Sequence, residues 1–171
     1  MKRHLLAIFA LAILVVAIGC GGGETSSTAK AGSSDSILNF SLNDLEGKPV
    51  DLSQYTGKVV ILDVWDTWCP PCRKGIPEFV DLYKNYKDQG LQIVGIALAR
   101  NGVPAVQKFV ADNKVDYLTV IGDKKIYDIF GEIRGIPTTF VIDKTGKLHQ
   151  KYVGYQPKSV FENQIKQLLA S

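Results

Sequence analysis

Cysteine and histidine are both scarce in this chain. Three cysteines and two histidines occur among its 171 residues. A structural zinc site needs four ligands, usually from these two types, and beyond Cys69 and Cys72 the chain after residue 36 offers only His149. His149 falls on the polar side of a predicted strand, where we expect it to face solvent. The sequence therefore disfavours a closed zinc site and predicts no metal and no cofactor.

A strongly basic surface is also missing from the composition. Twenty Lys and Arg stand against 17 Asp and Glu, which gives a net charge of +3. Lys2 and Arg3 lie at the extreme N-terminus, so residues 20–171 carry 18 basic and 17 acidic side chains, or +1. Because nucleic-acid binding requires basic side chains clustered on one face, we expect no nucleic-acid partner.

The chain lacks an apolar run long enough to span a bilayer comfortably. Residues 5–18 form an unbroken apolar run of 14 residues, whereas a spanning helix needs about 20. The run follows the basic start MKRH and precedes small residues, which is typical of a signal peptide. Residues 1–19 are therefore predicted to be a signal peptide that places the following domain outside the cytoplasm.

The end of this segment, AIGC, resembles the lipobox of bacterial lipoproteins, in which the cysteine becomes the lipidated first residue. Cys20 is therefore predicted to carry a membrane anchor, although Ala17 stands where leucine is usual. A plain secretory signal and a short anchor helix stay open as alternatives. Residues 21–36 are rich in Gly, Ser and Thr and predict a flexible linker, which leaves residues 37–171 as the folded domain.

From residue 37 onward, apolar runs alternate with segments of helical spacing. We predict strands at 58–65, 91–97, 118–121, 138–142 and 148–153, and helices at 70–88, 103–112 (with Asn101 as its cap), 123–130 and 158–170. Helices between strands imply parallel pairing, and the last two strands form a hairpin around the turn at 143–146. The pattern predicts an α/β domain with a central mixed sheet, helices on both faces and a small extra hairpin within residues 39–55.

The remaining cysteines lie in the stretch DVWDTWCPPCRKGIP, residues 63–77. A purely structural disulfide gains little in so short a loop, because stabilisation grows with loop length. The c-type haem motif requires histidine after the second cysteine, where Arg73 stands. Copper carriage stays open if Cys69, Cys72 and His149 converge.

A reactive pair accounts for more of the surrounding residues. Cys69 follows a predicted strand and opens a predicted helix, whose free N–H groups and partial positive charge favour a thiolate. Cys72 lies one turn further along, within reach to resolve a mixed disulfide. Pro70 and Pro71 have no N–H, so only the Cys72 N–H is left to donate to the Cys69 sulfur. This moderate stabilisation favours a reducing pair over a strongly oxidising one.

Two acids flank the cysteines on their N-terminal side. Asp63 lies inside a buried strand, so we expect burial to raise its pKa and make it a proton acceptor for Cys72. A hydrogen-bonded, structural aspartate stays an alternative. Asp66 is expected to be exposed beside the site, and we assign it no chemistry.

Several motifs together resemble the thioredoxin-like proteins: WCPPC after the strand that carries Asp63, Pro77 in the first helix, GIPT at 135–138 and VG at 153–154. The opening NFSLNDLEGKPVDLSQYTGKVVIL is similar to the extracytoplasmic TlpA and ResA type of thiol–disulfide oxidoreductase. The resemblance covers about residues 37–170. It implies a thioredoxin fold with an extra N-terminal hairpin and a helical insertion.

The resemblance also implies roles for individual residues. Cys69 would attack, Cys72 would resolve, and Pro137 would be a cis-proline facing the disulfide. The implied substrate contacts are Ile136, Pro137 and Gly154, and Trp68, by its position before Cys69, can offer a flat apolar contact to a partner. The partners would be protein disulfides of exported proteins, such as apocytochrome c, and a membrane electron donor that re-reduces the monomeric domain.

The same opening stretch also resembles the peroxiredoxins, which consume peroxide. In that family the reactive cysteine follows a PxxxTxxC pattern, and Asp66 stands where the pattern has threonine. A peroxidase therefore remains the second enzymatic interpretation, and a copper carrier the non-enzymatic one.

Overall fold

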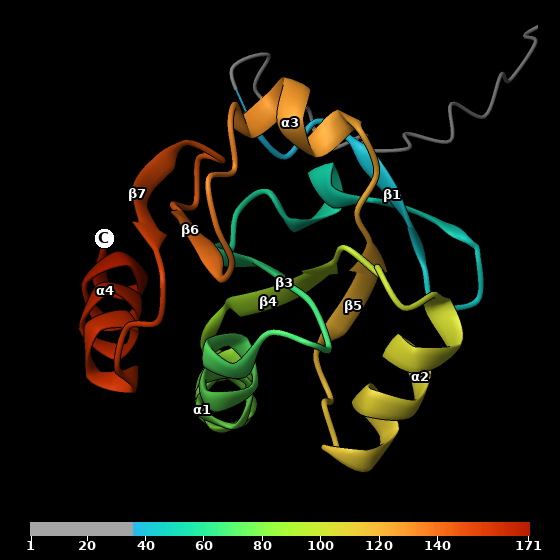
Figure 1. The fold of residues 1–171 in the computed structure, drawn as a ribbon. Coiled ribbons are helices and arrows are strands. Elements are labelled where there is room, and N and C mark those ends of the chain that lie inside the picture. The colour runs from blue at the N-terminus through green and yellow to red at the C-terminus, as the bar shows by residue number, and fades with distance from the viewer. Residues whose placement is uncertain (1–35) are drawn as a thin grey trace, which may run out of the picture.

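Seven strands form one mixed sheet in the order β2-β1-β5-β4-β3-β6-β7 (Figure 1). The computed structural model describes residues 36–171; the predicted signal peptide, Cys20 and nearly all of the predicted linker lie outside this part of the chain. The strands are β1 (Ser41–Asp44), β2 (Pro49–Asp51), β3 (Val59–Trp65), β4 (Leu91–Ala97), β5 (Leu118–Ile121), β6 (Thr138–Ile142) and β7 (Leu148–Val153).

The centre of the sheet is parallel and its edges are antiparallel. β3, β4 and β5 run parallel, whereas β6 pairs antiparallel with β3 and β1 pairs antiparallel with β5. Every residue of β3 and β4 is buried. Their sequences are apolar except for Asp63 and Gln92, because a strand covered on both faces has no solvent side for polar residues.

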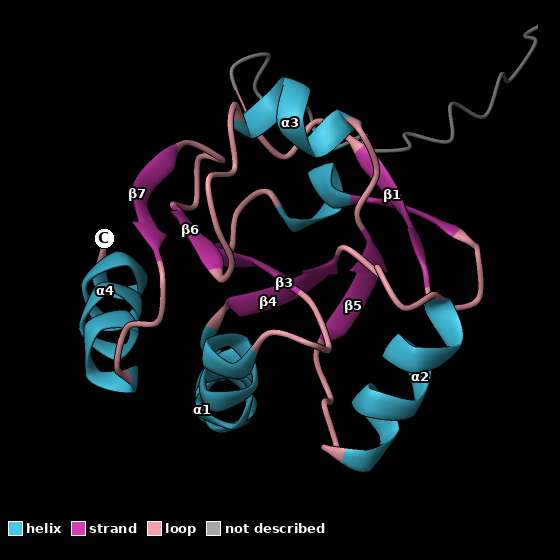
Figure 2. Cartoon of the chain, in the orientation of Figure 1, coloured by secondary structure: helices cyan, strands magenta, loops and turns pink. Residues whose placement is uncertain are grey.

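Helices cover both faces of the sheet, as predicted (Figure 2). The helices are α1 (Pro70–Tyr86), α2 (Val103–Asp112), α3 (Lys125–Phe130) and α4 (Lys158–Ala170), with short 3-10 turns η1 (Leu52–Tyr55) and η2 (Lys87–Gln89). α1, α2 and α4 contribute to the core on one face, and α3 and η1 to the core on the other. α1 and α4 touch through Phe79 and Phe161, whose ring centroids are 5.0 Å apart.

Most predicted elements are confirmed, and the differences lie at helix ends and at the N-terminal hairpin. α2 begins after Gly102, whose φ of +84° suits glycine, so the predicted Asn101 cap is wrong. α1 ends at Tyr86, two residues earlier than expected, because the chain tightens there into η2. The predicted hairpin forms as β1 and β2, and it extends the main sheet through β5. No helix within residues 36–171 has the length and apolar character needed to cross a bilayer.

The sheet register determines where the cysteines lie. β3 ends at Trp65, and the chain then turns through residues 66–69 into α1. The neighbouring β6 runs the other way and begins at Thr138, which pairs with Val64. The loop before β6 is therefore brought beside the first turn of α1, although about 70 residues separate them in sequence.

Candidate active site

A disulfide joins Cys69 and Cys72 at the N-terminus of α1. Cys69 is the N-cap residue, with extended backbone angles, and Pro70 and Pro71 occupy the first helical positions. The Cys72 N–H donates to Cys69 Sγ at 3.2 Å, as predicted from the two prolines. The sulfur thus takes the place of the side-chain oxygen that usually caps a helix, and the helix dipole favours negative charge there.

The loop before β6 faces this disulfide. The Ile136–Pro137 peptide bond is cis, as the resemblance implied. The carbonyl oxygen of Ile136 lies 3.6 Å from Cys69 Sγ. Gly154 is tied to the same loop, because its N–H donates to the Pro137 carbonyl oxygen at 2.8 Å. The register of β6 thus brings three of the residues predicted to contact substrate together beside Cys69.

A groove of about 370 Å³ borders the disulfide, and of the two cysteines only Cys69 lines it. Both cysteines are nearly buried, at 2% and 1% exposure. Cys72 does not line the groove. Trp68 stands at its edge and is 45% exposed. The lining residues are Trp68, Cys69, Pro70, Pro71, Leu98, Arg100, Tyr127, Ile133, Arg134, Gly135 and Ile136.

Asp63 lies on β3, the strand that leads into the turn before Cys69 and α1. It is 1% exposed, and the Thr139 hydroxyl donates to its Oδ1 at 2.9 Å. Burial raises the pKa of Asp63 to about 7, and the Thr139 hydrogen bond opposes that rise. The carboxyl can therefore take up and release a proton near neutral pH.

On β4, the strand next to Asp63, a glycine leaves space for the side chains of Trp65 and Tyr117. This glycine, Gly95, is the partner of Asp63. A Cβ at Gly95 would lie 2.9 Å from Trp65 Nε1 and 3.3 Å from the Tyr117 ring, so the glycine makes room for both. Trp65 Nε1 and the Tyr117 hydroxyl are buried without a hydrogen-bond partner among residues 36–171. Burial first, and then the Asp63 charge, raises the pKa of Tyr117 well above its ordinary value.

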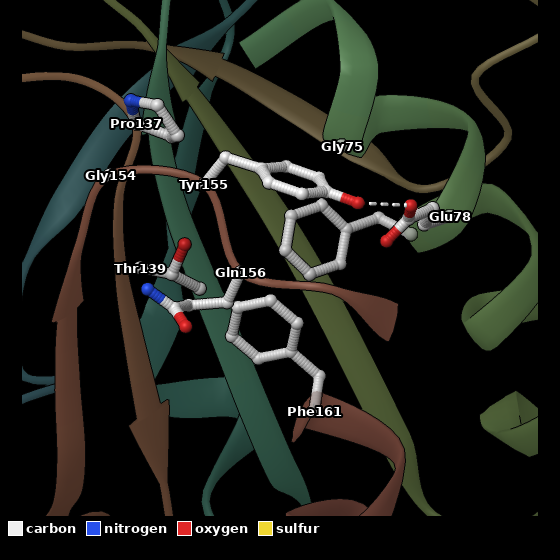
Figure 3. Close-up of a pocket in the computed structure, with 9 residues that line it drawn as sticks. Gly75, Glu78, Pro137, Thr139, Gly154, Tyr155, Gln156 and Phe161 are labelled. Carbon is white, nitrogen blue, oxygen red and sulfur yellow. Dashed lines mark hydrogen bonds between the residues drawn. The ribbon is translucent and has the colours of Figure 1, made fainter. Parts of the chain in front are cut away.

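A second, much smaller cavity lies behind the cis-proline loop (Figure 3). Its volume of about 10 Å³ is close to the minimum for one water molecule. Thr139, whose hydroxyl donates to Asp63, lines it, and the Tyr155 hydroxyl donates to Glu78 at 2.6 Å. Gly154 also lines it, with a φ of +84°. Apart from Gly154 and its two chain neighbours, no atom of residues 36–171 lies within 4 Å of where a Cβ would stand, so backbone conformation and not crowding requires glycine there.

Asp66 is buried, so the expectation that it is exposed is wrong. Its exposure is 0%. Oδ1 accepts from the Thr67 N–H at 2.7 Å, and Oδ2 accepts from the Arg100 N–H at 3.0 Å. The side chain turns inward because these backbone donors, one of them 34 residues away, replace its water. Sequence reasoning also missed Arg100, which lines the groove and gave no local signal.

The three ligands that copper carriage requires do not converge. His149 is exposed on β7, close to the pairing of Leu148 with Ile142, whereas the Pro137 loop lies beyond the opposite end of β6. No group of three or more His, Cys, Asp or Glu side chains in residues 36–171 is arranged to hold a metal ion. The geometry therefore gives Cys69 and Cys72 no third ligand from His149.

Comparison with known proteins agrees with this geometry. The family model described as AhpC/TSA matches residues 34–151. The thiol–disulfide oxidoreductase ResA of Bacillus cereus is 35% identical, over 98% of this chain and 99% of its own length. ResA of Bacillus subtilis is 32% identical, over 95% and 93%. The chain belongs to the ResA-type thiol–disulfide oxidoreductases of the AhpC/TSA family.

Solved structures support the same family at the level of the fold. A thiol:disulfide interchange protein of the thioredoxin family from Chlorobium tepidum superposes with a TM-score of 0.72. It is 32% identical, and the match covers 81% of this chain and 99% of that one. The ResA-type chain thus has a thioredoxin fold, and its enzymatic class is protein thiol–disulfide oxidoreductase.

Proposed function

We propose that the reduced domain transfers electrons from its two cysteines to disulfides of exported proteins. The Cys69 thiolate attacks one sulfur of the substrate, the substrate disulfide breaks, and a mixed disulfide forms. Cys72 then attacks Cys69 Sγ, which breaks the mixed disulfide and releases the substrate sulfur that Cys69 had attacked. Two electrons and two protons pass to the substrate, which leaves as a dithiol, and the domain keeps the Cys69–Cys72 disulfide.

The observation that carries this assignment is the groove that reaches Cys69 and not Cys72. A macromolecular substrate can approach only a sulfur that borders open space. Cys69 also lies at the N-terminus of α1, and its sulfur accepts a hydrogen bond from the Cys72 N–H. Both features stabilise a thiolate. Ile136, beside it, can pair through its backbone with an extended substrate segment, with Trp68 and Pro137 as neighbouring contacts and Gly154 supporting the loop.

Asp63 serves as the proton acceptor in the second step. Cys72 attacks as a thiolate, so its proton must leave, and a carboxyl with a pKa of about 7 can accept it and later return it. Asp63 lies on the strand that leads into the cysteine loop, in a site closed to bulk solvent. The structural alternative, an acid that only bonds Thr139, predicts no change in the rate of this step when Asp63 is replaced.

Sequence features support the proposed direction of electron flow and the proposed location. Pro70 and Pro71 withhold two N–H groups from the Cys69 sulfur, which favours a reductant over a strong oxidant. Residues 1–19 and Cys20 would direct the domain out of the cytoplasm and anchor it by lipid. A membrane electron donor would then re-reduce it, and apocytochrome c is one candidate substrate among exported proteins with cysteine pairs.

Two measurements test the proposed function. The variant C72S should accumulate a mixed disulfide between Cys69 and a substrate protein, whereas C69S should form none. Equilibration of the wild-type pair with glutathione should give a potential near about −270 mV, as for thioredoxin, and not near about −120 mV, as for a strong oxidant. Trapping through Cys72 in C69S, or a value near the oxidant, would overturn the attacking residue or the direction respectively.

A further inference from the structure

The Cys69 groove carries positive charge and no negative charge on its walls. Two of its lining residues, Arg100 and Arg134, are arginines, and none is Asp or Glu. Arg134 already pairs with Glu132, Nε to Oε2 at 3.0 Å. Among the ion pairs formed within residues 36–171, none involves Arg100. The groove therefore presents one uncompensated guanidinium.

The backbone of Arg100 is held in place by a buried carboxylate. Asp66 Oδ2 accepts the Arg100 N–H at 3.0 Å, and Leu98 N–H donates to the Trp65 carbonyl oxygen at 3.0 Å. Between them, Ala99 has a φ of +51°, which non-glycine residues seldom adopt. The segment after β4 is thus bonded to the last residue of β3 and to the loop that follows it, and these two bonds fix the backbone of Arg100.

The side chain of Arg100 lies over the Trp68 ring, with its Cζ 5.1 Å from the ring centroid. Both residues are exposed. Packing on an aromatic ring uses the flat face of a guanidinium and leaves the N–H donors at its edge available. Such an edge matches a carboxylate, which it can bind through two parallel hydrogen bonds.

We propose that Arg100 makes the groove selective for substrate segments that carry aspartate or glutamate beside the attacked cysteine. This inference rests on the proposed function. The occupant is an extended acidic polypeptide segment, whose cysteine sulfur meets Cys69 and whose flanking carboxylate binds Arg100 on the Trp68 ring. Asp66 is a positioning residue in this arrangement, because it acts on the substrate only through Arg100.

Three synthetic peptides with one intramolecular disulfide test the selectivity. They differ only at the residue beside the attacked cysteine, which is Glu, Gln or Lys, and each is mixed with the reduced full-length protein. The second-order rate constants should fall in the order Glu, Gln, Lys, with the Glu peptide about two- to fivefold faster than the Gln peptide. The ratio should shrink at high salt, because a partly exposed ion pair is screened.

Variants assign the selectivity to one arginine. R100Q should bring the Glu to Gln ratio close to one, whereas K108Q, which removes an exposed cation of α2 outside the groove, should keep it. Loss of the ratio in R134Q but not in R100Q would overturn the assignment. If R100Q does not fold, the salt dependence in the wild-type protein decides, and a ratio that salt leaves unchanged would contradict the proposal.

The outcomes also separate this inference from the function beneath it. If the wild-type protein reduces none of the three peptides, the proposed reductase function fails. If it reduces all three at equal rates, the function stands and the acidic selectivity is refuted.

Discussion

Two buried aspartates lie three residues apart just before the disulfide in the chain, and their surroundings differ. Asp63 lies in the middle of β3 and accepts from the hydroxyl of Thr139. Asp66 lies in the loop after β3, where two backbone N–H groups and the Thr67 hydroxyl donate to it. Asp63 is therefore a poorly solvated acid inside the sheet, whereas Asp66 links the loop after β3 to the loop after β4.

The contrast shows that burial alone does not tell what an acid does. A carboxylate inside a sheet finds the backbone N–H groups around it already used by the strands, so its charge stays uncompensated. A carboxylate at a strand end meets free N–H groups of turning chain, which can stabilise its charge. Asp63 is therefore suited to proton transfer, and Asp66 to holding the Trp68 and Arg100 loops together.

The largest predicted effect separates the two acids by the sign of the stability change. Burial raises the pKa of Asp63 from 3.8 to about 7, so between these pH values the folded state holds a proton that the unfolded state has lost. The stability of the oxidised protein should therefore fall as pH rises from about 4 to 7 and then level off. In D63N this fall should be absent. The free energy of unfolding of D63N, relative to that of the wild-type protein, should therefore rise by up to about 4 kcal/mol between about pH 4 and pH 8.

Chemical denaturation of both proteins across this pH range measures the difference. The test uses the pH dependence of the difference in free energy of unfolding, because the cost of burying the amide of D63N is the same at every pH and drops out. Parallel stability curves for D63N and the wild-type protein would show that Asp63 is ionised throughout, and would remove it as the proton acceptor.

The second effect has the opposite sign. D66N puts an amide NH₂ where one carboxylate oxygen accepts a backbone N–H, so one buried donor loses its partner. We expect a loss of about 1–3 kcal/mol in the free energy of unfolding at about pH 7, together with a weaker preference for acidic peptides. D112N, which breaks an exposed ion pair with Lys108 in α2, is the matched control and should change stability by less than about 0.5 kcal/mol. Equal losses in both variants would contradict the view that Asp66 links the loops that carry Trp68 and Arg100.

The smallest effect concerns the hydroxyl on Asp63. T139V keeps the shape of the side chain and removes the hydrogen bond that lowers the pKa of Asp63. The pKa should rise further, by no more than about one pH unit for a bond of about 1 kcal/mol. An NMR titration of the Asp63 carboxyl carbon measures this, and a pKa that falls in T139V would contradict the account.

The fold was largely predictable because the chemistry of each element is local. The apolar runs of β3 and β4 and the helical spacing of α4 are confirmed over nearly their whole lengths. The pairing of β1 with β5 was not predictable, since it joins segments almost 80 residues apart and no residue in either signals the other. The predicted Asn101 cap was wrong for a similar reason. Asparagine is a good cap by residue type, but the backbone conformation makes Gly102 the N-cap residue instead.

The site divides along the same line. Cys69, Cys72, Asp63 and the GIPT loop each carry a local pattern, and the register of β3 with β6 brings them together. The inward turn of Asp66 depends on an N–H from Arg100, and the groove wall at Tyr127 and Arg134 depends on where α3 lies. These contacts are set by tertiary structure, and nothing near Asp66 in the sequence distinguishes it from an exposed loop acid.

The most direct test of the central claim is the alkylation of the reduced protein by iodoacetamide as a function of pH, with the modified cysteine identified by mass spectrometry. The structure predicts that Cys69 reacts first and already reacts at about pH 7, because it alone of the pair borders the groove and caps a helix N-terminus. Modification of Cys72 first, or a Cys69 that reacts only above about pH 9, beyond the ordinary cysteine range, would contradict the account.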